Sequence, residues 1–585
     1  MKFLRNLLAA VLGCLIAFGI IFFMFLIFAS LASTEEGVTV KDDSVLELNI
    51  PYPVRDYTGN ADDDPFNLFY EPVMGLDEII HAITIAAEDD DIRGISLNNN
   101  FLMAGISQTQ AIRKALEDFK ATGKFVYAYG DFFMQKDYYL ATVADSIYIN
   151  PLGGMDFKGL AAEVLFFKDL QDKSGIKMEV VRHGKYKSAV EPFLDDEMSP
   201  ENREQISSLL ESVWGSMVSE IAEGRALSSE ALNSIADTLG ARLPEYAVAS
   251  DLVDGIIYSD EYENRLKRAT DRDLEDKLPV INVRDYMKRS SKRKIYSGKD
   301  KVAVIYAQGD IMYGEGGPNT IGQGLISKAL RKARDNDRVK AVVLRVNSPG
   351  GSAITSDIIW REVELTKEKI PVVVSMGNVA ASGGYYIAVG ADKIYAEPTT
   401  ITGSIGVFGT IPNISEFADK IGINAEQVGT NSNSVDYSLF EPMTPQFRGY
   451  VKESIEEVYS TFLRRVSDGR NISMAQADSL AQGRVWSGVE AKELGLVDEL
   501  GGLDDAIRAA AELAEISEYG IRKYPRFKTG FERFMDEMSS AKSEQVEARL
   551  KDEMGHELYS IFTELKSVVK QKGIQARLPY TIRIR

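Results

Sequence analysis

Cysteine is almost absent from the 585-residue chain, since Cys14 is the only one and lies in an apolar N-terminal run. A disulfide framework is therefore excluded, and the fold must rest on buried apolar surface, for which the length suffices for two or three domains. Basic residues are also in deficit, with 67 Lys and Arg against 87 Asp and Glu and a net charge of −20. That charge disfavours nucleic acid as a partner and favours solubility.

Histidine is nearly as scarce, with three residues in the whole chain, His81, His183 and His556. His81 lies in a helical pattern and His556 in the C-terminal region, both far from the glycine-rich loops described below. His183 lies four residues before Lys187 and stays open as a less favoured catalytic base. The sequence contains no metal-ligand cluster, nucleotide-binding loop or G-x-S-x-G motif, so we expect neither a metal nor a cofactor.

Charge is missing from residues 6–34, a run that follows Lys2 and Arg5 and ends before Glu35. The run exceeds the roughly 20 apolar residues that span a bilayer, and it is longer than the core of a signal peptide. We therefore expect residues 1–34 to form a short cytoplasmic tip and a transmembrane helix, with the body of the protein outside the cytoplasm. Cleavage at the small residues of ASLAS, 29–33, is the alternative.

A repeat of about 245 residues is the most informative feature that is present. KFVYAYGDFFMQKDYYLATVADSIYINP (124–151) matches PVVVSMGNVAASGGYYIAVGADKIYAEP (371–398), and YAVASDLVDGI (246–256) matches GVEAKELGLVDEL (488–500). In both copies short apolar runs alternate with amphipathic stretches, which is the pattern of strands connected through helices. The sequence thus predicts two tandem α/β domains with largely parallel strands.

The repeat also sets the expected domain boundaries. We place the first α/β half at 40–275, a linker at 276–300, the second half at 301–515 and a helical tail at 516–585. The linker holds the one basic cluster, KRSSKRK, which we interpret as solvated. Apolar residues at helical spacing in the tail predict a helix that packs on the body or on another subunit.

Three glycine-rich stretches occur in the second half and lack their glycines in the first. They are NSPGGSAITS (347–356), AASGGYY (380–386) and TGSIGVFG (402–409). Adjacent glycines free backbone N–H groups at the start of a helix, where they suit a developing negative charge. The second stretch carries Ser382 between small residues, and the third carries Ser404, so this half offers two candidate nucleophiles.

A serine nucleophile needs a base, and the first half holds a candidate base for the serines of the second half. KYKSAVEPFLDDEMSP (185–200) matches NSNSVDYSLFEPMTP (431–445), which sets Lys187 against Ser432. A lysine acts as a general base only when neutral, so its pKa must fall from about 10.4, which burial without a carboxylate partner achieves. The complementary losses predict one site, built across both halves from Lys187 and Ser382.

At these motifs the chain resembles the signal peptide peptidase A serine peptidases, peptidase family S49, in their long, duplicated bacterial form. The resemblance rests on YKSAVEPF, NSPGG, AASGGYY, TGSIGVFG and GLVDELGG and extends over nearly the whole chain. It implies a Clp-protease/crotonase-like fold, a homotetramer on the periplasmic face of the inner membrane, and cleavage of signal peptides after their release. It also implies roles for site residues: Ser382 as nucleophile, Lys187 as general base, Gly350 and Gly383 as oxyanion N–H donors, and Ser404 orienting the lysine amine.

Two other classes of function stay open from the residues alone. A crotonase-like acyl-transfer enzyme also holds an oxyanion with paired N–H groups, although an extracytoplasmic body argues against the use of cytoplasmic CoA. A catalytically idle membrane scaffold is the other class, and the presence of both Ser382 and Lys187 argues against it. We expect a membrane-anchored serine endopeptidase that acts on apolar, unfolded peptides without metal or ATP.

Overall fold

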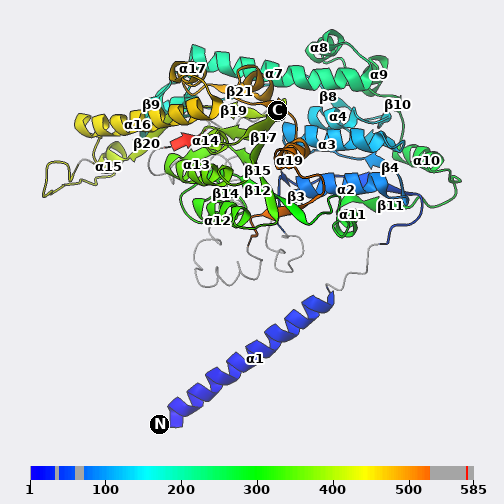
Figure 1. Ribbon diagram of the computed structural model, residues 1–585, viewed down its shortest axis with the longest axis horizontal. Helices are drawn as coiled ribbons and strands as arrows, with labels where there is room; N and C mark the ends of the chain where they lie inside the picture. Colours follow the sequence, from blue (N-terminus) through cyan, green and yellow to red (C-terminus); the bar gives the residue numbers. More distant parts are fainter. Residues whose placement is uncertain (1, 33–38, 60–71, 436, 528–574, 578–585) are drawn as a thin grey trace.

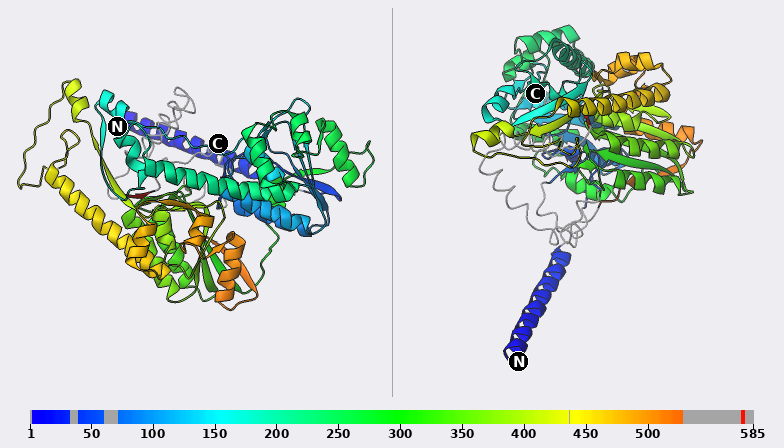
Figure 2. Two further views of the ribbon diagram at one scale, coloured as in Figure 1. Left: turned by 90° about the horizontal axis from the view of Figure 1, so that it is seen from above. Right: turned by 90° about the vertical axis from the view of Figure 1, so that its left-hand side faces the viewer.

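The computed structural model describes residues 2–32, 39–59, 72–435, 437–527 and 575–577. It consists of an α/β body and an N-terminal helix, α1 (Lys2–Ala32), which points away from that body in Figures 1 and 2. Within the described residues, no helix combines the length and the apolar character that crossing a membrane requires. The predicted transmembrane span is therefore not confirmed.

The first half is built on a parallel sheet of six strands in the order β10-β7-β5-β4-β1-β11. The strands are β1 (Ser44–Leu48), β4 (Ile92–Leu97), β5 (Phe125–Gly130), β7 (Ser146–Ile149), β10 (Gly255–Ile256) and β11 (Val280–Asn282). Two small two-stranded sheets pair β2 (Val54–Arg55) with β3 (Met74–Gly75) and β6 (Phe133–Met134) with β8 (Met155–Asp156).

The second half repeats this arrangement in the strand order β22-β18-β17-β15-β12-β23, again with parallel pairing. These strands are β12 (Asp300–Gln308), β15 (Val339–Ser348), β17 (Val372–Ala381), β18 (Lys393–Ala396), β22 (Glu499–Leu500) and β23 (Tyr519–Tyr524). The end of β17 also pairs with β19 (Ile401–Gly403), which pairs antiparallel with β21 (Val485–Ser487). The predicted α/β fold with two tandem repeats is confirmed.

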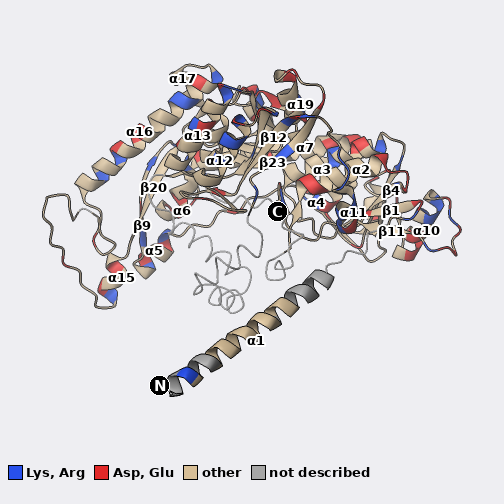
Figure 3. Ribbon diagram, turned by 60° about the horizontal axis from the view of Figure 1, so that its bottom comes forward, with Lys and Arg blue, Asp and Glu red and all other residues tan. Residues whose placement is uncertain are grey.

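Helices cover both sheets, and charges of both signs lie along them in Figure 3. In the first half they are α2 (Leu76–Glu88), α3 (Ile106–Lys120), α4 (Gln135–Ala141), α5 (Lys168–Ser174), α6 (Glu191–Leu194), α7 (Pro200–Arg225), α8 (Ser229–Asp237), α9 (Pro244–Ala249), α10 (Ser259–Ala269) and α11 (Val283–Ser290). In the second half they are α12 (Gln323–Arg334), α13 (Ala353–Lys367), α14 (Gly383–Ala388), α15 (Ser415–Lys420), α16 (Pro445–Arg470), α17 (Met474–Leu480), α18 (Gly488–Glu493) and α19 (Leu503–Leu513).

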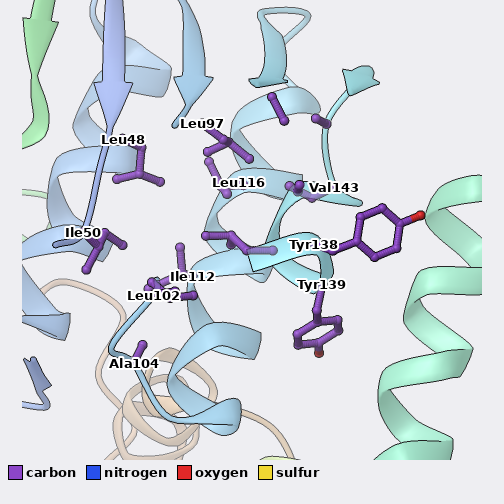
Figure 4. Packing of buried hydrophobic residues seen from close by; sticks show 14 of the residues in the cluster. Leu48, Ile50, Leu97, Leu102, Ala104, Ile112, Leu116, Tyr138, Tyr139 and Val143 are labelled. Atoms are coloured by element: carbon purple, nitrogen blue, oxygen red, sulfur yellow. The ribbon is translucent and has the colours of Figure 1, made fainter. Parts of the chain in front are cut away.

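Alternation along the central strands explains how each sheet is buried on both faces. In β12, Ala303 and Ile305 join the cluster that packs against α12 and α13, whereas Val302 and Val304 join the cluster that packs against α19. Successive strand residues point to opposite faces, so a strand covered on both sides must be apolar throughout. The same holds in the first half, where Figure 4 shows Leu48 and Leu97 facing helix α3.

Equivalent contacts confirm that the two halves repeat one design. The aligned tyrosines Tyr138 and Tyr385 are both fully buried, and their hydroxyls donate to the carbonyl oxygens of Leu252 and Leu496 at 2.9 and 2.8 Å. The long helices α7 and α16 both have 26 residues, and both begin at a proline, which suits a first helical turn. The repeat aligns those two prolines, so equivalent positions begin equivalent helices in the two halves.

A third sheet joins the halves, in the order β14-β13-β16-β24-β20-β9. Its strands are β9 (Lys177–His183), β13 (Asp310–Ile311), β14 (Thr320–Ile321), β16 (Gly350–Ser352), β20 (Val407–Asn413) and β24 (Gln575–Arg577). β9 from the first half pairs antiparallel with β20 from the second over seven residue pairs. This pairing carries the segment that follows β9 into the second half.

A buried polar network fixes the halves to each other at a second place. The carboxylate of Asp56, from the first half, accepts hydrogen bonds from Arg345 Nε at 2.7 Å, Gln108 Nε2 at 2.8 Å and Asn347 Nδ2 at 3.1 Å. Asp56 and Arg345 are each 2% exposed. A buried ion pair needs this degree of hydrogen bonding to offset the loss of hydration.

The elements extend past three of the expected boundaries. β11 and α11 lie within 276–300, where we expected a linker, and β11 closes the first sheet against β1. β23 lies beyond 515 and pairs with β12. In the expected helical tail, 528–574 and 578–585 lie outside the described residues, and the described residues of β24 form a strand.

Candidate active site

Ser382 lies on the sharp turn between strand β17 and helix α14. Its φ of 53° and ψ of −113° belong to a region that non-glycine residues rarely adopt, and its N–H donates to the carbonyl oxygen of Gly403 at 2.8 Å. The residue is fully buried. A residue in a sparsely populated conformation between a strand and a helix is a candidate functional residue, and strand-to-helix turns are also where α/β-hydrolases carry their serine.

Lys187 lies on the turn that follows β9 and reaches Ser382 from the first half. Its Nζ is 2.9 Å from Ser382 Oγ, 3.0 Å from Ser404 Oγ and 3.0 Å from the Ser404 carbonyl oxygen. A neutral amine has two N–H donors and one lone pair, so the two Ser404 oxygens can accept both donors while the lone pair faces the Ser382 hydroxyl. The three contacts therefore suit the neutral form.

Burial lowers the pKa of the Lys187 amine well below its ordinary value. The side chain is fully buried, and the ring of Phe408 has its centroid 6.0 Å from Nζ. Among the described residues, no ion pair joins this amine to a carboxylate to restore the charged form. Removal of water without a counter-charge is the cause of the shift.

Two glycines that surround Lys187 provide the space for it. A Cβ added to Gly483 would lie 2.6 Å from the Cα of Lys187, and one added to Gly406 would lie 3.2 Å from its Cδ. Gly483 was not among the residues predicted from the sequence, because a lone glycine in AQGRVW carries no local sign of a contact almost 300 residues away. Its φ of +81° also requires glycine.

The glycine loop after β15 lies beside Ser382. A Cβ on Gly350 would lie 2.7 Å from the backbone nitrogen of Gly383, so a side chain at that position is excluded. The N–H of Gly350 donates to Ser348 Oγ at 3.1 Å. Gly350 thus lies next to the backbone nitrogen of Gly383, and its own N–H is held by a side chain.

The other sequence candidates lie in different surroundings. His183 Nδ1 is 2.9 Å from Glu456 Oε2, and its ring stacks on Tyr459 with centroids 3.9 Å apart. His81 Nε2 is 3.0 Å from the Ser290 carbonyl oxygen, and His556 lies outside the described residues.

The repeat counterparts of the two site residues have other roles. Ser432, the counterpart of Lys187, lies on an exposed turn. Gln135, the counterpart of Ser382, accepts hydrogen bonds through Oε1 from the N–H groups of Lys158 and Gly159, at 3.0 and 2.8 Å. The first half therefore has a glutamine bonded to backbone N–H groups at the position where the second half has Ser382.

The role of Gly483 gives a test of the lysine position. Gly483→Ala should displace Lys187 and slow the reaction of Ser382 with a fluorophosphonate by at least tenfold, because a base displaced by ~1 Å loses its effect. Gly123→Ala is the matched control, since Gly123 has a similar φ of +88° but no atom within 4 Å of its Cβ position. Equal effects of the two substitutions on labelling rate would show that backbone strain alone matters.

Comparison with known proteins shows similarity over most of the chain. The model of peptidase family S49 matches residues 118–273 and 364–517. The chain is 38% identical to Protease 4 of Salmonella typhi over 85% of this chain and 81% of that protein. It is also 38% identical to Protease 4 of Haemophilus influenzae, over 74% of this chain and 72% of that protein.

Among solved structures, the chain is similar to a ClpP1 mutant from Listeria monocytogenes. The TM-score is 0.23 and the identity 18%, over 35% of this chain and 94% of that one.

The family model matches once in each repeat and covers more than half of the residues. The chain therefore belongs to peptidase family S49 and is a serine endopeptidase.

Proposed function

We propose that Ser382 is the nucleophile and Lys187 the general base of this endopeptidase. The observation that carries the proposal is the 2.9 Å contact between Lys187 Nζ and Ser382 Oγ, both fully buried and contributed by different halves. The neutral amine accepts the hydroxyl proton as Oγ attacks the carbonyl carbon of a peptide bond. The C–N bond then breaks, and the protonated amine passes the proton to the leaving nitrogen.

The second stage repeats the same proton transfers with water. A water molecule attacks the ester on Ser382 while Lys187 accepts its proton, and the acid product leaves as the proton returns to Oγ. Ser404 keeps the lone pair of the amine on the Ser382 side, because its two oxygens accept both N–H groups.

We assign the oxyanion to the N–H groups of Gly383 and Gly350. Donors held in place before the reaction stabilise the charge that develops on the carbonyl oxygen. In comparable enzymes each such donor lowers the activation barrier by about 3 kcal/mol. The Gly350 N–H donates to Ser348 Oγ, so it must turn away from that hydroxyl before it can donate to an oxyanion.

The substrates we propose are extended apolar peptides, with released signal peptides as the physiological class. A nucleophile buried at the end of a strand is inaccessible to folded proteins, whereas a single extended segment can pair with the adjacent strand β16. Membership of an endopeptidase family removes the acyl-transfer enzyme and the idle scaffold from consideration.

Three substitutions test the two roles. Ser382→Ala and Lys187→Arg should each lower kcat/KM for an apolar peptide by ~10³-fold or more, because guanidinium stays protonated and cannot accept a proton. Ser432→Ala, at the repeat counterpart of Lys187, should change it less than twofold. Circular dichroism and fluorophosphonate labelling accompany the kinetics. Residual activity of Ser382→Ala within tenfold of the parent would remove Ser382 as nucleophile.

The pH dependence tests the base. Only the neutral amine accepts a proton, so kcat/KM should rise with pH through one ionisation and then level off. Because burial lowers the pKa of Lys187, the midpoint should lie well below the ordinary value of about 10.4. His183→Ala should leave the midpoint unchanged, since His183 contacts Glu456 and Tyr459. A midpoint near 6.5 that vanishes in His183→Ala would transfer the role to histidine.

We also propose that the protein assembles as a ring of copies, four by resemblance to the family. Within one chain β9 pairs with β20, and the repeat aligns these strands with 422–428 and 160–166. Neither aligned segment belongs to a sheet within the described residues. Exposed side chains occur along both, including Leu165 at 47% and Val428 at 100%.

The two unpaired segments align with two strands that pair with each other, so they can pair between copies in the same way. Segment 422–428 of one copy can pair with 160–166 of the next, as β9 pairs with β20, and such a head-to-tail contact forms a ring when the rotation between copies closes. The same pairing would satisfy the backbone groups at both edges.

Sedimentation velocity tests the assembly. The parent should sediment as an oligomer, and Val428→Asp should shift it towards the single chain of 64.8 kDa by placing a charge in the paired edge. Leu152→Asp is the control, since Leu152 is 94% exposed and lies outside both segments. A parent that sediments as a single chain at micromolar concentration would contradict the proposal.

A further inference from the structure

A single glutamine of helix α7 contacts the turn that carries Lys187 on both sides of the lysine. Gln205 Nε2 lies 3.1 Å from the carbonyl oxygen of Tyr186 and 3.0 Å from Ser188 Oγ. These two residues come immediately before and after Lys187 in the chain. Gln205, Lys187 and Ser188 are all fully buried, so bulk water does not compete for these hydrogen bonds.

The oxygen of the same amide binds the second half. Gln205 Oε1 accepts a hydrogen bond from the N–H of Val485, the first residue of β21, at 3.3 Å. β21 pairs with β19 through Gly403↔Val485, and the Gly403 carbonyl oxygen accepts from the N–H of Ser382. The amide of Gln205 therefore connects the backbone that holds the proposed base with the backbone that holds the proposed nucleophile.

Two further contacts fix the helix that carries Gln205 to the second half. Ser208 Oγ donates to Glu490 Oε1 at 2.6 Å, and Ser212 Oγ lies 2.7 Å from Ser487 Oγ. Residues 205, 208 and 212 have the spacing that places them on one face of a helix. This face of α7 lies against β21, and Figure 1 shows the two elements next to each other. The amide is thus held in place before any reaction begins.

Charged side chains near this turn have partners other than the Lys187 amine. Glu191, which is 1% exposed, accepts a hydrogen bond from an asparagine of α7. Glu204 accepts from Arg484 Nη1 at 2.7 Å, and Arg182 Nη1 donates to the carbonyl oxygen of Lys187 at 3.4 Å. A carboxylate that reached the amine would favour its charged form. A neutral amide can fix the turn without that effect.

We propose that Gln205 is a positioning residue for the general base, and that it holds the Lys187 turn at the distance from Ser382 that proton transfer needs. The proposal rests on the function proposed above for Ser382 and Lys187. Gln205 acts through the backbone of the turn, because its hydrogen bonds go to the neighbours of the lysine. Without the amide, the turn loses its connection to β21 and water reaches the amine. Water stabilises the charged form, so the pKa of Lys187 then rises towards its ordinary value.

The kinetics of Gln205→Leu test the proposal, since leucine keeps most of the side-chain volume and lacks both polar atoms. At neutral pH, kcat for an apolar peptide should fall by ~10-fold or more while KM changes less than threefold, because displacement of a base slows the reaction and leaves peptide binding intact. Fluorophosphonate labelling of Ser382 should slow by a similar factor. The midpoint of the pH profile should move to higher pH, so part of the lost activity should return in alkaline solution.

Gln171→Leu is the matched control. Gln171 of α5 is also buried, and its amide also joins two backbone groups, the carbonyl oxygen of Phe193 at 2.8 Å and the N–H of Met178 at 2.6 Å. Its loss should lower the melting temperature as the loss of Gln205 does, but kcat should change less than twofold and the midpoint should stay where it is. If Gln205 only stabilises the fold, the two variants should behave alike, and that outcome would overturn the proposal.

Ser188→Ala makes a smaller change to the same contact, because it removes one acceptor of the Gln205 amide with the loss of a single oxygen. It should lower kcat by ~3-fold and move the midpoint in the same direction, and it decides the question if Gln205→Leu does not fold. Unchanged kcat and midpoint in Ser188→Ala and in folded Gln205→Leu would overturn the proposal and leave the catalytic assignment intact. Full activity of Ser382→Ala or Lys187→Arg would instead overturn the catalytic assignment itself, whatever the Gln205 variants show.

Discussion

An amine that must accept a proton near neutral pH has to be kept out of water without meeting a carboxylate. Every unit by which the pKa falls corresponds to about 1.4 kcal/mol, so the burial of Lys187 has to be offset by the rest of the fold. The surroundings meet this requirement with uncharged partners. The two oxygens of Ser404 accept from the amine, and Gly483 and Gly406 let the backbone close around the side chain.

The division of the site between two repeats follows from this constraint. Lysine and serine are held by separate elements, so their 2.9 Å separation depends on the contacts that join the halves. Pairing of β9 with β20 fixes the position of the turn that carries Lys187. The carboxylate of Asp56 sets the other side, because it binds Arg345 and Asn347 in the segment that leads to the glycine loop. One carboxylate of the first half thereby positions backbone of the second.

Much of this arrangement could be predicted from the sequence, because duplication leaves local signals that can be compared. The aligned prolines both begin 26-residue helices, and the aligned tyrosines both bond to a leucine carbonyl. The mismatch of Lys187 with Ser432 predicted that the first half supplies the base, and the structure has Lys187 Nζ 2.9 Å from Ser382 Oγ. Contacts between distant segments left no such signal. Tertiary structure determines the positive φ of Ser382, the contact between Gly483 and Lys187 and the pairing of β24 with β16. The periodicity of the sequence carries no information on any of them.

Edge pairing then connects the proposed catalysis with the proposed assembly. A strand edge with unpaired N–H and C=O groups recruits any extended segment of suitable shape, which is a hazard in most folds. The proposed extended substrates need such an edge, and β16 provides one at the glycine loop beside Ser382. In the structure β24 of the same chain covers this edge and pairs with β16 at three positions. The carbonyl oxygen of Ala576 lies against the Cβ positions of Gly350 and Gly383, so an extended segment can lie along β16 only because neither residue carries a side chain.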